Sequence, residues 1–486
     1  MDGVALRSNT PSTIGMCSMG KKFDESITFR NLYRAMQACA RNVMWKDSVA
    51  GYAVSNGMEN TFLLRKQSLT GTYRIDPYQR FFVFEPKKRP VTSTRFKDRQ
   101  FQRAFCDGGL YEDMTRPFIR TNCACQRGRG VDDAMDMMDV LLRRYYNEQR
   151  QKAGMRNEHH QPPYKVDGWV LCLDVRKFFP STPHDTAKDA ILKRTRDMQI
   201  AAEACAVVES FTILEIEDDL VAIGVPAKLA RRAAYAISKE RSNAVRISIS
   251  EPEQAKAAVR EARENIRFIV ANINGLSDDV RASFLQRCTN GKFCGIGLGS
   301  QVSQLVELAV LDSTDHFVKE QLNCRYYGRY MDDFRIISDS KERLRECWKS
   351  IEQMINSKGL ELNQKSCIYP LHYGVKFLQW KFVLTDTGKV IRRISHEKLT
   401  KERRCLRKLK NDLDAGERTM KSIEDHYQSF CANLERGNTS EDILKMDRYY
   451  KAIFGVRPIK PKKKGAKKNG RYINTSRAAA ETAAGE

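Results

Sequence analysis

Apolar residues recur along this chain at two spacings, which predict a mixture of helices and strands. Between residues 29 and 45 they lie three or four positions apart, so they line one face of a predicted helix. Helical spacing or Ala-rich composition predicts further helices over residues 135–146, 227–240, 253–269, 302–311 and 341–357. Short apolar runs predict buried strands over residues 168–173, 324–329 and 334–338.

Two hairpins are expected from the same pattern. Residues 81–84 and 91–94 are strand-like and flank the basic turn Pro86–Pro90, which places cations at the tip of the first hairpin. Residues 375–382 and 389–394 predict the second hairpin, which precedes a long helical region.

The chain is strongly basic. Its 84 Lys and Arg residues outnumber 60 Asp and Glu residues, for a formal net charge of +24. The helical region 396–454 is basic, and residues 457–471 contain basic residues, Pro and Gly but no acidic residue, which predicts an unfolded tail. Such a surplus suits a polyanionic partner that is bound with release of counterions. Nucleic acid is therefore the first candidate partner, and an anionic membrane surface is the second.

Membrane contact is not expected. No apolar run approaches the roughly 20 residues that a spanning helix needs. Residues 1–22 lack the hydrophobic segment of a secretory signal and are expected to be disordered. With 486 residues and 41% apolar side chains, the chain can form two to four domains with cores of their own. We therefore expect a cytoplasmic protein that needs no disulfide scaffold.

The cysteines and histidines give no metal-binding pattern in the sequence. The 14 cysteines are scattered, and one residue separates Cys123 from Cys125, instead of the roughly two to four of a zinc clamp. We interpret the cysteines as reduced thiols. The adjacent His159 and His160 lie in a polar stretch that predicts a solvated loop.

Carboxylates supply the candidate chemistry. Asp332 and Asp333 are adjacent in a turn between two apolar strands, where like charges suppress each other's ionisation unless a cation lies between them. Asp174 ends another buried strand. If that strand neighbours the hairpin, the three carboxylates can hold two Mg²⁺ ions roughly 3.5 to 4 Å apart for in-line nucleotidyl transfer. The pairs Asp132–Asp133 and Asp218–Asp219 lack apolar strand-like flanks and are interpreted as solvated turns.

Several motifs resemble those of bacterial reverse transcriptases. Tyr330-Met331-Asp332-Asp333 resembles their YxDD signature, and Leu173-Asp174-Val175-Arg176-Lys177-Phe178-Phe179-Pro180 resembles the palm motif that precedes it. Five further blocks are similar to family motifs and occur in the family's order, namely Glu85–Arg89, Asn122–Ala134, Leu298–Gln304, Gly359–Lys365 and Val375–Trp380. The resemblance covers roughly residues 76–455, so the chain is identified as a member of this family.

The resemblance implies an α+β protein with a right-hand polymerase fold. The domains it implies are an N-terminal extension with a first helix (1–75), fingers (76–165), a palm (166–395) with a helical insertion at about 200–285, a thumb (396–455) and a disordered basic tail (456–486). The implied activity is RNA-directed DNA polymerase. The implied partners are an RNA template, a DNA or RNA primer and dNTPs, with a structured non-coding RNA or an accessory protein as further candidates.

Family roles carry over to the matching positions. Asp174, Asp332 and Asp333 are the implied catalytic residues and ligands of two Mg²⁺ ions, with the Val175 carbonyl as a further ligand and Mn²⁺ as an alternative metal. Phe179 matches the steric gate that excludes a 2′-hydroxyl.

Other positions are implied to contact the nucleotide or the primer. Candidate triphosphate ligands are Lys87, Arg89 and Arg95, because cations match phosphate oxygens. Lys365 resembles the lysine that protonates pyrophosphate. The primer grip corresponds to Phe377, Leu378, Gln379 and Trp380, with Gln379 where a glycine is usual.

The nucleotide-contacting block Leu298–Gln304 departs from the commonest family form. It reads LGxxxSQ, with Leu298, Gly299 and Gln304 at the nucleotide-binding positions, where most members have QGxxxSP. This form is similar to that of diversity-generating retroelements, whose copying is error-prone opposite adenine. Defence-associated and unclassified bacterial relatives share parts of it, and the long insertion fits the compact diversity-generating type poorly. The biological role therefore stays divided between diversification and antiphage defence.

Two other functions are also compatible with the sequence. One is a template-independent or protein-primed DNA polymerase, and another is a non-catalytic RNA-binding relative. Loss of any of the three aspartates would favour the non-catalytic reading, and all three are present. A group II intron maturase is disfavoured because no endonuclease domain with paired cysteines follows the thumb.

Overall fold

The computed structural model describes residues 21–84, 89–155 and 163–459. Several residues singled out in the sequence lie outside the described residues, namely Lys87, His159 and His160. The same holds for residues 1–20, for nearly all of the basic tail and for the side chain of Arg89. The chain forms two compact units. The first contains residues 1–377 and 384–389, and the second contains residues 378–383 and 390–486. Each combines helices with strands, a mixture that is compatible with the predicted α+β class.

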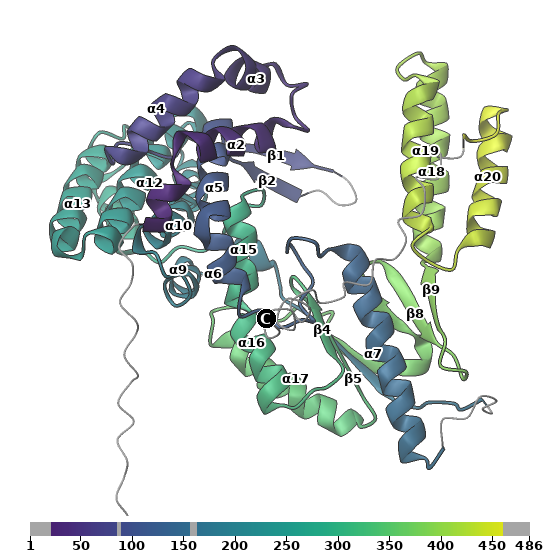
Figure 1. Cartoon of the computed structure of the whole chain (residues 1–486). Coiled ribbons are helices and arrows are strands. Elements are labelled where there is room, and N and C mark those ends of the chain that lie inside the picture. Colours follow the sequence, from purple (N-terminus) through teal and green to yellow (C-terminus); the bar gives the residue numbers. More distant parts are fainter. Residues whose placement is uncertain (1–20, 85–88, 156–162, 460–486) are drawn as a thin grey trace, which may run out of the picture. The chain divides into compact units, whose positions relative to one another are not determined.

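A four-stranded antiparallel sheet organises the first unit (Figure 1). Its strand order is β4-β5-β3-β6, and the strands are β3 (Trp169–Asp174), β4 (Tyr327–Tyr330), β5 (Asp333–Ser338) and β6 (Cys367–Pro370). Long apolar runs make β3 and β5 central strands, because their side chains are buried on both faces. The predicted strands are confirmed, although β4 begins three residues later than expected.

Helices on either side of these strands in the sequence complete the core. The helix α17 (Lys341–Asn356) buries Leu344 and Ile351 in the same apolar cluster as Leu171 and Ile336 of the sheet. The helix α7 (Val131–Lys152) packs so closely on β4 that a Cβ at Gly328 would lie 2.4 Å from the sulfur of Met137. Glycine at this position therefore permits the helix to approach the strand.

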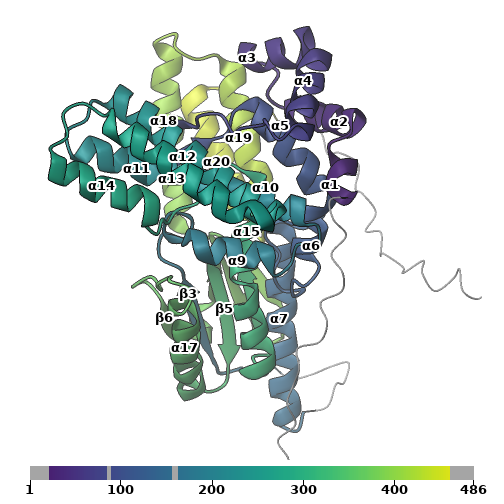
Figure 2. The same cartoon turned by 90° about the vertical axis from the view of Figure 1, so that its left-hand side faces the viewer.

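Helices fill the chain between β3 and the block at Leu298 (Figure 2). They are α8 (Phe178–Ser181), α9 (His184–Leu192), α10 (Met198–Ser210), α11 (Thr212–Ala222), α12 (Ala227–Ser250), α13 (Ala255–Ala271) and α14 (Asp278–Asn290). The central helix is α10, where every residue from Ile200 to Ser210 is buried. Asp197 caps α10 by accepting hydrogen bonds from the backbone N–H groups of Gln199 and Ile200. The helices predicted for this region are thus present, with α12 longer than expected and α13 shifted by two residues toward the C-terminus.

The N-terminal part of this unit is also mainly helical. Its helices are α1 (Lys21–Ser26), α2 (Phe29–Ala40), α3 (Asp47–Ala50), α4 (Gly57–Leu69), α5 (Phe96–Phe105) and α6 (Tyr111–Thr115). The predicted hairpin is confirmed as β1 (Gln79–Val83) paired with β2 (Arg89–Ser93). The first predicted helix ends at Ala40, before the expected end at residue 45, because the apolar spacing continues into a turn.

Two further helices and one strand of the first unit follow the inserted helices in the sequence. They are α15 (Gln301–Val310), α16 (Asp312–His316) and β7 (Val375–Phe377). The prediction of a single strand over residues 375–382 is wrong, because these residues form two strands separated by a turn at Leu378 and Gln379. Both turn residues have positive φ, 51° and 68°, which ends β7 and reverses the chain.

The described part of the second unit, which ends at residue 459, contains two neighbouring strands and three helices. They are β8 (Trp380–Leu384), β9 (Val390–Ile394), α18 (His396–Asp414), α19 (Met420–Leu434) and α20 (Ser440–Phe454). Leu406 and Leu409 of α18 are buried, and Leu413 on the same helix face is half-buried. The aromatic rings of Tyr427 and Tyr450 lie 4.5 Å apart between α19 and α20. This basic region is therefore a packed helical unit.

The two other pairs of adjacent aspartates lie in helices, contrary to the prediction of solvated turns. The Asp132–Asp133 and Asp218–Asp219 pairs do not form turns, because the first pair lies in α7 and the second in α11. In α7, Asp133 accepts a hydrogen bond from the N–H of Gly130.

The cysteines in the described segments are free thiols, as predicted. Among the helices in those segments, none is long and apolar enough to cross a membrane.

Candidate active site

The antiparallel register of the sheet brings the candidate aspartates together. Asp174, the last residue of β3, is directly opposite Asp333, the first residue of β5. Asp332 occupies the turn before β5, and its carbonyl accepts a hydrogen bond of 3.2 Å from the N–H of Val175. Residues directly opposite in an antiparallel pair have Cα atoms about 4.5 to 5.5 Å apart. The three carboxylate-bearing residues therefore lie at one end of the sheet.

Asp174 is held by the segment that precedes β6. Asn363 donates from its side-chain Nδ2 to Oδ2 of Asp174 at 2.8 Å, and from its backbone N–H to the Asp174 carbonyl at 2.7 Å. These two bonds fix both the carboxylate and the backbone of Asp174. The segment Gly359–Lys365 resembles a family motif, but the role of Asn363 comes from the structure.

Asp333 is paired with a cation on its own strand. Arg335 donates from Nη1 to Oδ1 of Asp333 at 2.6 Å and from Nη2 to Oδ2 at 3.2 Å. Burial raises the pKa of Asp333, an effect that Asp174 increases and the Arg335 guanidinium opposes. Arg335 was not singled out in the sequence, although its position two residues after Asp333 places it on the same face of β5.

The turn between β4 and β5 is supported by a buried ion pair. Arg329 is fully buried and donates to both carboxylate oxygens of Asp315, and its Nη1 donates to the Met331 carbonyl at 2.7 Å. Met331 has a positive φ of 55°, which bulky residues rarely adopt. The bond from Arg329 therefore helps to hold the aspartate turn in this conformation.

A fourth carboxyl group lies in the same region. Glu307 of α15 is fully buried, and its Oε2 accepts a hydrogen bond of 2.9 Å from Thr182 Oγ1. Burial raises the pKa of Glu307 to about 8, and the negative charge of Asp332 contributes to the rise. Glu307 is therefore mostly protonated at neutral pH. Its apolar surroundings in the sequence gave no signal of this proximity.

The candidate sugar gate follows Asp174 by five residues in the sequence and is partly accessible. Phe179 of α8 is half-buried, and its carbonyl accepts a hydrogen bond of 2.8 Å from the N–H of Ile296. This bond connects α8 to the segment that leads into Leu298 and Gly299. Phe179 and the block after Ile296 are thus brought together by the backbone.

The Leu298–Gln304 block lies beside the first hairpin. Leu298 is 37% exposed, and a Cβ at Gly299, whose φ is +121°, would lie 3.2 Å from the carbonyl of Thr92 on β2. Ser300 caps α15, and its Oγ accepts a hydrogen bond from the N–H of Ser303 in the first turn. Gln304, Gly299 and Arg127 line a cavity of about 410 Å³.

The candidate cations are not brought to the aspartates by any described contact. Lys365 is exposed, and its backbone N–H donates to Oδ1 of Asn363 at 3.1 Å. Arg95 is exposed at the start of α5, and its Nε donates to the Pro77 carbonyl at 3.2 Å. Arg95 also lines a groove with the basic residues Arg231 and Arg232.

The primer-grip candidates surround the turn after β7. Phe377 and Trp380 are buried, whereas Gln379 is exposed. Gln379 adopts the left-handed conformation with a φ of 68°. This backbone explains why a glycine suits the position, because glycine adopts positive φ without the steric cost of a side chain.

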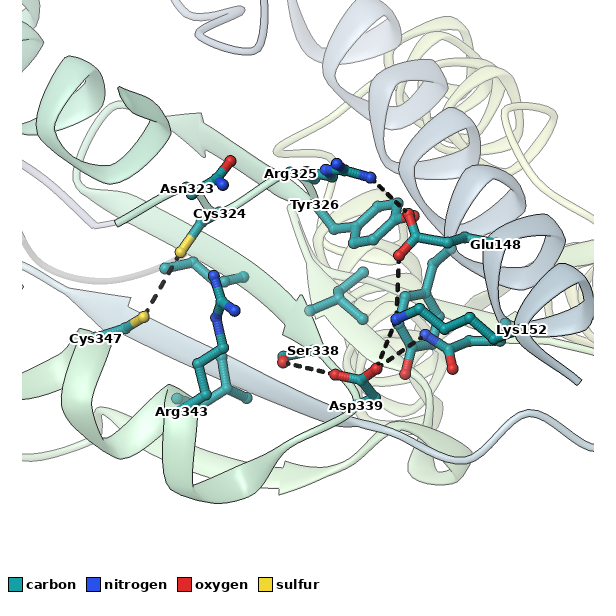
Figure 3. Close-up of a pocket in the computed structure, with 15 residues that line it drawn as sticks. Glu148, Lys152, Asn323, Cys324, Arg325, Tyr326, Ser338, Asp339, Arg343 and Cys347 are labelled. Carbon is teal, nitrogen blue, oxygen red and sulfur yellow. Dashed lines mark hydrogen bonds and ion pairs between the residues drawn. The ribbon is translucent and has the colours of Figure 1, made fainter. Parts of the chain in front are cut away.

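A cavity of about 340 Å³ lies at the other end of β5 (Figure 3). There Lys152 pairs with Asp339 at 2.9 Å, and the Sγ atoms of Cys324 and Cys347 lie 3.6 Å apart. Asp339 is six residues beyond Asp333, which corresponds to about 20 Å along a strand. This cavity is therefore distinct from the aspartate cluster.

Comparison of the chain with models of known protein families finds no match, and comparison with curated proteins finds none either.

Proposed function

We propose that this protein is an RNA-directed DNA polymerase with a right-hand polymerase fold. The observation that carries the proposal is the register of β3 and β5, which sets Asp174 opposite Asp333 with Asp332 in the adjoining turn. The order of the motifs along the chain supports it independently. In this proposal the fingers comprise residues 76–165, the palm 166–395 and the thumb 396–455.

The donor set suits divalent magnesium. Carboxylate oxygens are the ligands that Mg²⁺ prefers, and the raised pKa of Asp333 reflects a buried carboxylate that a further cation would stabilise. Asp174, Asp332 and Asp333 would hold the ions, with the Val175 carbonyl as a further ligand. When bound, two Mg²⁺ ions would activate the primer hydroxyl and neutralise the leaving pyrophosphate.

The residues around the aspartates would position the reactants. Asn363 orients the Asp174 carboxylate, and Arg329 holds the turn that carries Asp332. The ring of Phe179 would lie under the incoming sugar and exclude a 2′-hydroxyl. Leu298 and Gln304 would contact the nucleotide and the template strand. Catalysis of this kind depends mostly on positioning and charge neutralisation.

The test is extension of a labelled primer on an RNA template with Mg²⁺ and dNTPs. The single variants Asp174→Asn, Asp332→Asn and Asp333→Asn should each lower the rate by at least about 10³-fold, because each removes a metal ligand with little change of shape. Asp339→Asn is the matched control, since Asp339 follows the opposite end of β5 and its pair with Lys152 is exposed. Its activity should stay within about twofold of the wild type.

The outcomes separate the alternative functions. Complementary DNA that disappears in the three variants and persists in Asp339→Asn would support the proposal. DNA whose sequence is unrelated to the template would replace it with template-independent synthesis. RNA binding without any synthesis, when primer and structured RNA partners have been supplied, would contradict it in favour of a non-catalytic RNA-binding protein.

The biological setting is proposed as a bacterial retroelement or an antiphage defence system. Sequencing the products would distinguish them, because clustered errors opposite template adenine point to diversification and accurate copying points to defence.

A further inference from the structure

Three potential metal ligands meet between two helices of the second unit. Glu402 and Cys405 lie on α18, and His426 lies on α19. Their ligand atoms all lie within 4.8 Å of one another. Nε2 of His426 is 2.9 Å from Oε1 of Glu402 and 3.7 Å from Sγ of Cys405. This Glu402–Cys405–His426 cluster is separate in the sequence from the three aspartates.

The packing of the helices explains why these residues meet. Glu402 and Cys405 are three residues apart on α18, so their side chains share one helix face. Leu406 and Leu409 of α18 are buried, as are Ile423, Tyr427 and Phe430 of α19, so an apolar interface stabilises this unit. The cluster is therefore held by rigid elements and not by a loop.

We propose that the Glu402–Cys405–His426 cluster binds one Zn²⁺ ion. Thiolate, imidazole and carboxylate are the three ligand types that zinc takes in proteins. The thiolate and the imidazole disfavour Mg²⁺, which takes oxygen ligands. The proposal does not depend on the proposed polymerase activity.

Two of the three distances between donor atoms are close to those of a zinc site, and the third, between Sγ of Cys405 and the carboxylate of Glu402, is at most 4.8 Å. With metal–ligand distances of about 2.0 to 2.3 Å, neighbouring ligands in a tetrahedral site lie about 3.3 to 3.6 Å apart. The observed 3.7 Å between sulfur and nitrogen is close to this value, and the 2.9 Å between nitrogen and oxygen needs a small opening. The hydrogen bond between His426 and Glu402 would be exchanged for two metal bonds.

The solvent accessibility of the cluster is also compatible with binding of an ion. The side chain of Glu402 is 11% exposed and that of His426 is 36% exposed, so an ion can reach the donors from solvent. Three protein ligands leave the fourth tetrahedral position for water. An ion in this place joins α18 to α19 and stabilises the helical unit, because ligands on both helices must stay together for it to bind.

The test uses the full-length chain after treatment with a chelator. Zinc is added in competition with a chromogenic chelator, and Co²⁺ is added to a second sample as a spectroscopic probe. The wild type should bind Zn²⁺ at a site that Cys405→Ser and His426→Gln each weaken by at least about tenfold. Its Co²⁺ form should show a thiolate-to-cobalt charge-transfer band that Cys405→Ser removes.

Matched controls identify the site. Cys367→Ser and His372→Gln change an exposed cysteine and an exposed histidine outside the cluster and should leave the zinc affinity and the cobalt band unchanged. If Cys405→Ser fails to fold, Glu402→Gln keeps the size of the side chain and should give the same loss of affinity. Zinc should also raise the midpoint of thermal unfolding in the wild type but not in the cluster variants.

A cobalt spectrum without the thiolate band would overturn the proposal. So would a zinc affinity that is unchanged in all three cluster variants. Neither result depends on DNA synthesis, so failure of the zinc site and failure of the polymerase proposal are distinguishable.

Discussion

Asn363 holds Asp174 through two hydrogen bonds, one to the carboxylate at 2.8 Å and one to the backbone carbonyl at 2.7 Å. If Asp174 binds a metal, Asn363 determines which carboxylate oxygen faces the ion. Residues that orient metal ligands are expected to affect metal affinity almost as strongly as the ligands themselves.

Asn363→Ala should therefore raise the Mg²⁺ concentration needed for half-maximal primer extension by about 10- to 100-fold. The measurement is a magnesium titration of the extension rate. Gln364→Ala is the control, because Gln364 is exposed and adjacent to Asn363. An equal fall in rate at every Mg²⁺ concentration would contradict a role in orienting Asp174.

The ring of Phe179 is expected to select deoxynucleotides. Phe179→Ala should raise the relative kcat/KM for ribonucleotides over deoxynucleotides by about 10- to 200-fold, because removal of the ring leaves space for a 2′-hydroxyl. Single-nucleotide incorporation assays measure the ratio. Phe268→Ala, which truncates a phenylalanine that is 73% exposed on α13, should leave the ratio unchanged. Unchanged discrimination in Phe179→Ala would argue against a steric gate.

The exposed Leu298 is expected to influence fidelity. Most reverse transcriptases have a glutamine at the corresponding position, whose amide is expected to contact the nucleotide, and the aliphatic side chain of Leu298 lacks that amide. Leu298→Gln should therefore lower the error frequency opposite template adenine, which sequencing of the complementary DNA measures. Gln301→Leu, a change three residues later in the same block, serves as the comparison. Equal error frequencies for the wild type and Leu298→Gln would show that the side chain at position 298 does not set the fidelity.

A buried ion-pair network joins three helices of the first unit. Glu209 of α10 lies 2.7 Å from Nε of Arg241 on α12 and 2.9 Å from Nζ of Lys188 on α9. Burial by itself would raise the pKa of Glu209, but the charges of Arg241 and Lys188 prevail and lower it to about 2. Glu209→Gln would leave two cations without their buried partner, which should lower the free energy of unfolding by about 3 to 5 kcal/mol.

The pH dependence of this loss has a definite sign. A carboxyl group whose pKa is lowered by folding adds stability above its unfolded pKa of about 4.3, and this stability is lost as the pH falls toward about 2. The difference between the wild type and Glu209→Gln in urea unfolding should therefore be full above about pH 5 and shrink below it. Glu253→Gln, at an exposed position, should show no such difference. A difference that grows on acidification would contradict the network.

Local signals in the sequence were sufficient to predict most of the helices and strands and to single out the three aspartates as candidates. The apolar runs of β3 and β5 are continuous, and the turn at Tyr330–Asp333 separates two strands, so both strands could be recognised from neighbouring residues alone. The Asp218–Asp219 pair was misread because adjacent acids have no periodicity, and only the helix around them shows that they are not a turn.

Relations between distant residues were decided by the tertiary structure. Asp174 and Asp333 are 159 positions apart, and only strand pairing sets them opposite each other, because a shift of one residue in register would point one of them to the other face. Glu307 looks like an ordinary helical residue in the sequence. Only the fold buries its carboxyl group near Asp332, and both the burial and the negative charge of Asp332 raise its pKa. The chain by itself thus determined which chemistry was available, and packing decided which groups meet, because periodicity reports the face of each element and not its partner.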